Sequence, residues 1–401
     1  MFGIIYGIVI VIIIMGNIGI AELVHRSVVK EYYRTNSPSK ANLKLKRLQY
    51  VHVGITPFAM LALVVAMAFL AKEIMPNNLH AREAGRFFIS NIFPFLYPLI
   101  IWTASSMIYY NTYKVVRSVD ETKADWVWKK FIEFVLFIFP IFFMSTRHHI
   151  IEKIETYIWI WNIGFALLGV IAIRVLQFYF IQLILHTEPI KDNIVKQMIT
   201  DILKNHNIKN CVIYQFSSIK SKYVNAYVMG VLSKKILISD YLIKQFTNNE
   251  FEAIITHEIA HLKKYHLSIQ LFIILFGWLF FREITYTLGI ILESIFGFYI
   301  PYALGVIIPL TVVFSYILLG FPLLSRFHER QADAYAIRTG ILPEVLISAL
   351  TKGAQLNESP ETLGKFEEKF ESHPSLSNRI KYIKKFAESM NTSRKQSSKR
   401  A

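Results

Sequence analysis

The feature that most constrains the fold of this chain is a series of seven apolar blocks. They cover residues 1–20, 50–71, 87–110, 131–145, 157–185, 267–281 and 304–324. Most approach or exceed the roughly 20 residues that a helix needs to cross a bilayer. The fourth block is short, contains Pro140 and is also compatible with a re-entrant segment, while the sixth is short but can extend into the apolar stretch that follows. The pattern predicts a polytopic α-helical membrane protein with about seven spans.

Composition excludes several other classes of protein. Hydrophobic residues make up 54% of the chain and charged residues only 18%, whereas a soluble domain carries about a quarter charged residues. The chain is therefore neither disordered nor a purely soluble enzyme. A single cysteine, Cys211, excludes an intrachain disulfide framework and a thiolate metal cluster. The net charge of +16 would suggest nucleic acid in a soluble protein, but a lipid bilayer explains it more simply, and we expect no nucleic-acid partner.

The basic residues predict the orientation in the membrane. The short loops 21–49 and 111–130 hold 7 and 5 Lys+Arg, against 3 and 2 in the opposite loops 72–86 and 146–156. Because cytoplasmic loops carry the excess of positive charge, we expect the N-terminus outside and the long polar segments and C-terminus in the cytoplasm. The membrane would be the plasma membrane of a bacterium or the endoplasmic reticulum of a eukaryote. The first block has no Lys or Arg before its apolar core, which favours an uncleaved anchor over a signal peptide.

The first long polar segment contains a motif with the spacing of a metal site, His257-Glu258-Ile259-Ala260-His261. On a helix, two histidines four residues apart lie on one face, so both imidazoles can reach one ion. Glu258 lies beside them and can hold a water molecule without ligating the ion. The alternative is a solvated amphipathic helix in which the histidines are incidental. The motif favours a zincin-like metal site.

A catalytic zinc site needs three protein ligands and one open position. The best candidate for the third ligand is Glu329, which follows the last apolar block. Asp333 lies one turn further along the same helix face and could accept a ring N–H from a ligand histidine. Two alternatives stay open: Glu329 forms a surface salt bridge with Arg326 or Arg330, or His328 is the ligand. On a helix, His328 faces about 100° away from Glu329.

Together these motifs resemble the family-48 gluzincin metallopeptidases. The resemblance rests on HEIAH, on E-x-x-x-D just after a span, and on Ser372-His373-Pro374-Ser375 followed by Arg379-Ile380. Upstream, the run from Asn225 to Gly230, then Lys235-Ile236 and Asp240, is similar to the segment that precedes HExxH in that family. Five predicted spans before the motif and two after it match the CAAX prenyl endopeptidase type 1 branch, with the HtpX-type proteases as the sister branch. The likeness covers roughly 190–385 by motif and the N-terminal half by topology alone.

The resemblance implies how the metal is held. One Zn²⁺ per chain would be bound by His257, His261 and Glu329. Glu258 would act as the general base, and Asp333 would orient a ligand histidine. In this interpretation no covalent enzyme intermediate is needed, because water is the nucleophile.

The resemblance also implies which residues meet the substrate. His373 and Arg379 would stabilise the oxyanion or clamp the scissile region. Strand addition at Asn225, Ala226 and Tyr227 would hold the substrate backbone. The alternatives are that His373 and Asn225 are plain loop or strand residues, and that Arg379 belongs to a basic helix face.

The sequence thus predicts a mainly α, small-β-sheet, zincin-like catalytic domain assembled from two cytoplasmic segments. The predicted parts are a five-span membrane domain (1–185), a catalytic segment with three strands and the HEIAH helix (186–266), two further spans (267–324), a second catalytic segment (325–390) and a disordered basic tail (391–401). The expected strands are Cys211–Phe216, Tyr223–Met229 and Lys234–Ser239, and the expected helices lie near 189–205, 248–264, 325–340, 343–357 and 376–389.

The predicted function is that of an integral-membrane zinc endopeptidase acting on peptides or membrane-associated proteins. A CAAX-prenyl-protease-like activity is favoured by the predicted topology, and an HtpX-like protease for membrane protein quality control is the alternative within that class. A membrane sensor or scaffold with a structural zinc site is the alternative from another class. The intact Glu258 argues against it, since a closed metal site gains nothing from an unliganded glutamate there.

Overall fold

The computed structural model describes residues 2–52, 93–145, 158–229, 234–273, 291, 294, 320–364 and 367–398. The chain divides into two compact units. One comprises Met1–Trp161 and Val175–Ile184, and the other Asn162–Arg174 and Leu185–Ala401. All the motif residues from Asn225 onward belong to the second unit. The five-part division expected from the sequence stays a prediction.

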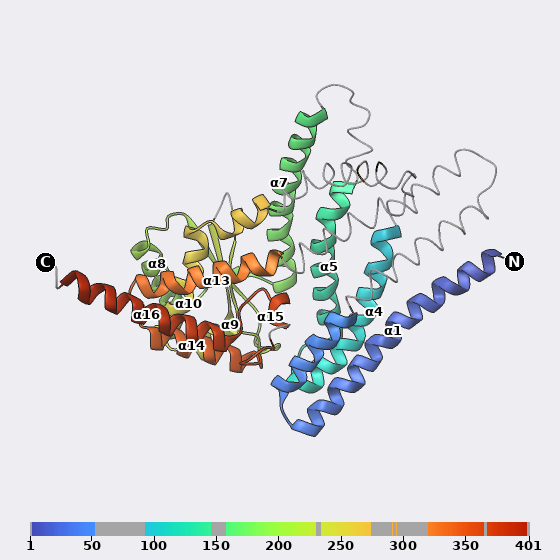
Figure 1. Ribbon diagram of the computed structural model, residues 1–401, viewed down its shortest axis with the longest axis horizontal. Coiled ribbons are helices and arrows are strands. Elements are labelled where there is room, and N and C mark those ends of the chain that lie inside the picture. The colour runs from blue at the N-terminus through green and yellow to red at the C-terminus, as the bar shows by residue number, and fades with distance from the viewer. Residues whose placement is uncertain are drawn as a thin grey trace. The chain divides into compact units, whose positions relative to one another are not determined.

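The first unit is built from long helices. Helix α1 (Phe2–Thr35) packs against α4 (Phe93–Arg117), which packs against α5 (Lys123–Ser145) (Figure 1). Residues 38–52 are also helical, and Ala41 joins Val24, Val28 and Val116 in a small buried cluster. Helix α5 runs without a break through Pro140, so within the described residues the fourth apolar block contains no re-entrant turn. A further helix, α7 (Ile158–Leu185), is divided between the two units, because its residues Asn162–Arg174 belong to the second.

Within the described part of the chain, one helical stretch, Val11–Thr35, is long and apolar enough to cross a membrane. Most of the second and seventh blocks, about half of the sixth and the first residues, 87–92, of the third lie outside the described residues. The expected count of seven spans therefore stays a prediction.

The second unit contains a four-stranded sheet in the order β1-β2-β4-β3. The strands are β1 (Glu188–Pro189), β2 (Cys211–Phe216), β3 (Ala226–Met229) and β4 (Lys234–Ser239). Strand β4 pairs in parallel with β2 and antiparallel with β3. Its consecutive residues Ile236, Leu237 and Ile238 are all fully buried, as expected for a central strand covered on both faces. The predictions for β2 and β4 are confirmed, β3 is shorter than predicted, and the two-residue β1 was not predicted.

Seven helices of the second unit have defined bounds in the described residues. They are α8 (Asn193–Asn205), α9 (Asp240–Gln245), α10 (Asn248–Lys263), α13 (Phe321–Arg338), α14 (Pro343–Leu356), α15 (Glu367–Phe370) and α16 (Leu376–Ser398). Helix α8 begins later than predicted because the Asp192 carboxylate caps it, accepting hydrogen bonds from the backbone N–H groups of Ile194 and Val195.

Helix α16 differs from the sequence prediction at its C-terminal end. It continues to Ser398, eight residues into the stretch expected to be a disordered tail from Asn391. That stretch contains neither Gly nor Pro up to Ser398, so nothing in it interrupts a helix that is already formed, and adding each further residue avoids the cost of nucleation.

The packing of α10 against α13 brings the two halves of the motif together. Ala260 on α10 and Ala332 and Ala336 on α13 are fully buried, and small side chains allow two helix axes to approach closely. Helix α16 packs against both α13 and α14. Figure 1 shows α16 in dark red beside the orange α13. Ile383 of α16 shares a buried cluster with Ala336 and with Ala253 of α10. Helices far apart in the sequence thus converge on the HEIAH helix.

Candidate metal centre

The HEIAH helix is fixed at its N-terminal end by a capping box. The Thr247 hydroxyl oxygen accepts from the Glu250 backbone N–H, and the Glu250 carboxylate accepts from the Thr247 N–H at 3.1 Å. The same carboxylate accepts from the Ser348 hydroxyl at 2.7 Å and from the Lys352 ammonium at 3.2 Å, both on α14. These contacts hold the pKa of Glu250 at about 2, although burial alone would raise it. The start of α10 is thereby tied to a neighbouring helix.

About two turns after Glu250, the two motif histidines meet Glu329 of α13. The ligand-type atoms of His257, His261 and Glu329 all lie within 4.8 Å of one another. The two imidazole Nε2 atoms are 3.4 Å apart. Glu329 Oε2 lies 3.4 Å from His257 Nε2, and Oε1 lies 3.6 Å from His261 Nε2. Three donor atoms from two helices therefore converge on one small volume.

This donor set fits a zinc ion. Two imidazole nitrogens and one carboxylate oxygen form the three-ligand set of a catalytic zinc site with one position left for water or substrate. Within the described residues, the buried Glu329 Oε2 accepts no hydrogen bond, so this oxygen has a lone pair available for a metal ion. All three side chains are at most 16% exposed.

The outer nitrogens of both histidines have partners of their own. His257 Nδ1 lies 3.0 Å from Oδ1 of Asp333, the contact anticipated for that residue. His261 Nδ1 lies 2.9 Å from Nδ1 of His266, whose Nε2 is 2.9 Å from Gln331 Oε1. An acceptor at Nδ1 keeps the proton there and leaves Nε2 bare for a cation. Both imidazoles are thus arranged to present Nε2 to the shared volume.

The two alternatives for Glu329 and His328 are not supported by the geometry. His328 is buried, stacks on His266 with ring centroids 4.1 Å apart, and is not part of the trio. Arg326 directs its guanidinium to backbone carbonyls of residues 368–371 rather than to Glu329. Glu329 instead faces inward, where it is 4% exposed.

Two residues of the last helix region complete the surroundings of Glu329. His373 Nδ1 lies 3.2 Å from Glu329 Oε1, and this imidazole is 65% exposed. Arg379 Nη1 lies 3.4 Å from Glu329 Oε2, and Nε donates to Asp333 Oδ2 at 3.0 Å. The Arg379 side chain is only 12% exposed. Its guanidinium contacts the carboxylates of Glu329 and Asp333 on α13. The His373 imidazole, in contrast, lies at the solvent-exposed side of the site.

Charge and burial set the protonation of these groups. Burial raises the pKa of Glu258 to about 7, against the opposing effect of His257. Burial also disfavours protonation of His257, but the carboxylates of Asp333 and Glu329 outweigh it and raise its pKa to about 10. Burial, assisted by the charge of His257, lowers the pKa of His261 to about 3. The pKa of Glu329 lies well below its usual value, because the basic groups around it outweigh its burial.

The predicted substrate-binding residues lie at the edge of the sheet. Ala226 and Tyr227 pair with β4 as the first two residues of β3, the last strand in the sheet order. Asn225 directly precedes the strand, and its backbone N–H donates to the Ser239 hydroxyl. Its side-chain amide, which is half-buried, donates to the Tyr223 hydroxyl at 3.0 Å. β3 packs against α10, so this edge borders the helix that carries the motif.

Sequence reasoning missed several residues of this site. Among them are His266, which follows α10 and contacts His261, and Gln331 of α13, which contacts His266. Another is Glu368, which binds the backbone after His373. A histidine five residues after HEIAH was visible in the sequence. Neither Gln331 nor Glu368 belongs to a recognisable pattern, since each acts through a contact distant in sequence.

Comparisons with known proteins agree with this geometry. The profile of peptidase family M48 matches residues 189–387, about half of the chain and all the residues of the site. A second profile, BlaR1 peptidase M56, matches residues 53–283, which include HEIAH but end before Glu329.

Similar proteins carry names from the same group. The CAAX prenyl protease 1 of Saccharomyces cerevisiae is 25% identical over 273 residues, covering 60% of this chain and 58% of that protein. A CAAX prenyl protease 1 homolog of Arabidopsis thaliana is 34% identical over 179 residues, covering 41% of each. A protease HtpX homolog of Janthinobacterium is 25% identical over 182 residues, covering 39% of this chain and 60% of that protein. The chain thus spans less than two thirds of the length of these relatives.

The fold has a counterpart among solved structures. The crystal structure of S. mikatae Ste24p superposes with a TM-score of 0.61 at 17% identity, covering 94% of this chain and 98% of that one. The shared fold is mainly helical with a small sheet. The family profile, the relatives and the converging HExxH and glutamate motifs lead to one assignment: the chain belongs to peptidase family M48.

Proposed function

We propose that this protein is an integral-membrane, zinc-dependent endopeptidase. The observation that carries the proposal is the convergence of His257, His261 and Glu329 within 4.8 Å beside a glutamate, Glu258, that is not one of the three. Two imidazoles and one carboxylate leave the fourth coordination position of a zinc ion open. This is the arrangement of a hydrolytic zinc site, whereas a structural site has four protein ligands. Glu258 is then available for proton transfer.

Helix α10 supplies two of the three metal ligands and the base, and α13 supplies the third ligand. Bound Zn²⁺ polarises a scissile carbonyl and makes a water molecule acidic enough to react near neutral pH. Glu258, with a pKa near 7 caused by burial, is suited to take a proton from the attacking water and to return it to the leaving amine. The nucleophile is water, so the protein forms no covalent bond to the substrate.

His373 and Arg379 have different parts in this proposal. The exposed imidazole of His373 can donate a hydrogen bond to the oxygen on which negative charge develops. The glutamate beside it raises the pKa of His373 and so favours the protonated, donating form. Arg379 is bound to Asp333 and Glu329, and we assign it to holding those carboxylates rather than to clamping the substrate.

The edge of the sheet gives a place for the peptide. A substrate segment can add to β3 as a fifth strand, since its main-chain groups would pair with the outer side of an edge strand. Asn225 stands at the start of that edge with a half-buried side chain and can meet the substrate backbone. In this proposal an extended peptide would lie along the edge of the sheet that borders α10.

The direct experiment measures metal and activity on the same preparation. Detergent-purified protein is expected to contain about one zinc per chain and to cleave a library of peptides internally. A chelator should abolish both the metal content and the cleavage, and added Zn²⁺ should restore them. Metal-replete protein that cleaves no peptide, or cleavage that survives complete removal of the metal, would exclude the proposal.

The substrate class follows from the relatives rather than from a residue of this chain. Two of them are named CAAX prenyl proteases. We therefore propose that the substrate of this protein is a prenylated protein or peptide, which meets the site at the cytoplasmic face of the membrane. In this proposal the protein itself crosses the membrane about seven times. A farnesylated peptide should be cleaved with a higher kcat/KM than its unlipidated twin. Equal rates for the two peptides would favour a more general protease of the HtpX type.

A further inference from the structure

The segment that carries His373 is held from two sides by residues that no motif includes. It lies between α15 and α16 and approaches α13, whose Glu329 contacts the His373 imidazole. An exposed side chain on a connecting segment needs its backbone fixed if its tip is to stay in place, because each ordered residue costs conformational entropy. Arg326 and Glu368 make the contacts that fix this backbone.

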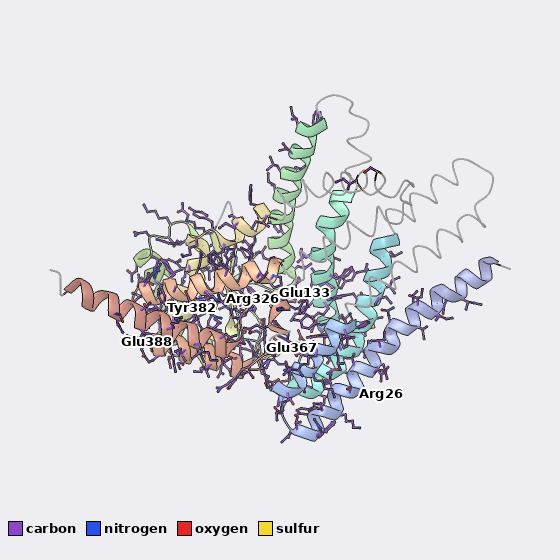
Figure 2. The ribbon with its side chains drawn as sticks, viewed as in Figure 1. Arg26, Glu133, Arg326, Glu367, Tyr382 and Glu388 are labelled. Carbon is purple, nitrogen blue, oxygen red and sulfur yellow. The ribbon has the colours of Figure 1, made fainter. Side chains whose placement is uncertain are left out.

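The first hold comes from Arg326 on α13, labelled in Figure 2. Its Nη1 lies 2.7, 2.9 and 2.8 Å from the backbone carbonyl oxygens of Glu368, Lys369 and Glu371. These carbonyls belong to α15 and to the residue after it, two positions before His373. Arg326 and Glu329 are three residues apart, so they lie on neighbouring positions of one helix face. One face of α13 therefore holds the backbone ahead of His373 and contacts its imidazole.

The second hold comes from Glu368. Its Oε1 accepts from the Ser375 backbone N–H at 2.9 Å and from the Ser375 hydroxyl at 3.1 Å. Both carboxylate oxygens accept from the Asn378 side-chain amide, at 2.8 and 2.7 Å. Ser375 is buried and directly precedes α16, so a single carboxylate fixes the backbone two residues after His373. Its pKa is lowered by these donors despite burial, which keeps it an acceptor.

We infer that Arg326 and Glu368 are positioning residues that clamp the segment 371–375 and thereby keep the His373 imidazole at Glu329. The inference rests on the role proposed above for His373. Neither side chain belongs to the metal-binding trio or reaches a catalytic group. Their effect on the reaction passes through the backbone on either side of one histidine. The geometry thus extends the site to the interface of α13, α15 and α16.

The kinetic test is a double-mutant cycle. Arg326→Met and Glu368→Ala should each lower kcat by about 10- to 100-fold with KM nearly unchanged, since a misplaced catalytic group costs rate rather than ground-state binding. In a His373→Ala background, which retains residual activity, the same changes should lower kcat less than twofold. The matched controls are Arg330→Met on α13 and Glu361→Gln, whose side chains are exposed; both should behave like wild type. Zinc content should stay constant in all variants.

A second readout does not depend on activity. Hydrogen exchange of the segment 371–375, measured by mass spectrometry, should speed up in Arg326→Met and Glu368→Ala and not in the controls. Unchanged exchange, or a loss of kcat that is the same in the presence and absence of His373, would overturn the inference. If the wild-type protein cleaves no peptide, the proposed function fails and the exchange experiment still decides whether the clamp exists.

Discussion

At the scale of single residues, the site separates metal binding from proton transfer. His257, His261 and Glu329 form the trio, while Glu258 on the same helix as the histidines is left out of it. Burial brings the pKa of Glu258 to about 7, near the pH at which a general base is most effective. These two sets of residues should therefore respond differently to substitution.

Glu258→Gln should keep the metal and lose hydrolysis. The amide has nearly the same shape but cannot accept a proton, so kcat should fall by about 100- to 10,000-fold. Zinc content and melting temperature should match those of wild type. Glu252→Gln, on the same helix, is the control and should retain full activity. A Glu258→Gln enzyme with wild-type kcat would show that this glutamate is not the base.

Glu329→Ala should instead lose the metal. Removing one of three protein ligands should weaken zinc binding by more than the roughly 10- to 100-fold that loss of an outer hydrogen-bond partner causes. The measurement is zinc per chain after dialysis against a competing chelator of known affinity. Glu344→Ala, an exposed residue of α14, is the control. Retention of full zinc stoichiometry by Glu329→Ala would mean that the third ligand lies elsewhere.

Metal binding should also release a proton. Without metal, Asp333 and Glu329 outweigh burial and raise the pKa of His257 to about 10, so this imidazole is protonated at pH 7. It must lose that proton to bind a cation, whereas His261, with a pKa of about 3, is already neutral. Apparent zinc affinity should therefore rise about tenfold per pH unit between pH 6 and 8, with about one proton released per ion.

Titration calorimetry in two buffers of different ionisation enthalpy measures this number directly. Asp333→Asn removes one of the carboxylates that keep His257 protonated, and it should reduce the number of protons released. Equal heats in both buffers for the wild-type protein would contradict the expected linkage.

At the scale of helices and strands, the capping box of α10 is the feature that starts the catalytic helix. Thr247→Ala removes the hydroxyl that accepts from the Glu250 N–H and should lower the free energy of unfolding by about 1 kcal/mol. Thermal unfolding in detergent, followed by circular dichroism, measures the loss. As a control, the activity per folded molecule of Thr247→Ala should equal that of wild type, because Thr247 lies ten residues before the first metal ligand, His257. No loss of stability would show that the cap is dispensable.

The same box predicts acid sensitivity. The Glu250 pKa is lowered to about 2 by hydrogen bonds that outweigh its burial. The contribution of this carboxylate to stability is therefore complete above its ordinary pKa of 4.5 and is lost as the pH falls toward 2.

Most elements near the site could be predicted from the sequence because their causes are local. The apolar run of β4, the β-branched and aromatic residues of β2 and the Thr247–Glu250 cap are all visible in short windows. Strand β3 starts three residues late for a reason that is not local. The backbone N–H and carbonyl of Val224 pair with the side chain of Asn357 at the end of α14 rather than with β4. No window around Val224 contains that partner.

The site shows the same division. HEIAH is a local motif and predicts its own geometry, because i and i+4 share a helix face. The approach of Glu329 depends on buried alanines that let α10 and α13 pack closely. The hold on His373 depends on Arg326 and Glu368, which contact backbone atoms that any sequence could supply. Contacts of side chains to distant backbone leave no pattern in the sequence.

At the scale of the whole molecule, the orientation in the membrane decides which substrates can reach the site. The loops 21–49 and 111–130, with 7 and 5 basic residues, are predicted to be cytoplasmic. The loops 72–86 and 146–156, with only 3 and 2, are predicted to lie on the opposite side of the membrane. The prediction places the residues of the metal centre on the cytoplasmic side and the loop 72–86 outside. The loop 146–156 should also be outside if the fourth apolar block crosses the membrane.

Single cysteines can test this arrangement, because Cys211 is the only cysteine in the chain and Cys211→Ser gives a cysteine-free background. In intact cells, or in sealed vesicles of matching orientation, a membrane-impermeant maleimide should label Asn78→Cys and Thr146→Cys. It should label Ser217→Cys, at an exposed position of the catalytic unit, only after permeabilisation. Labelling of Asn78→Cys without Thr146→Cys would mean that the fourth block does not cross the membrane. Labelling of Ser217→Cys in intact cells would place the site outside, where it could not meet a cytoplasmic substrate.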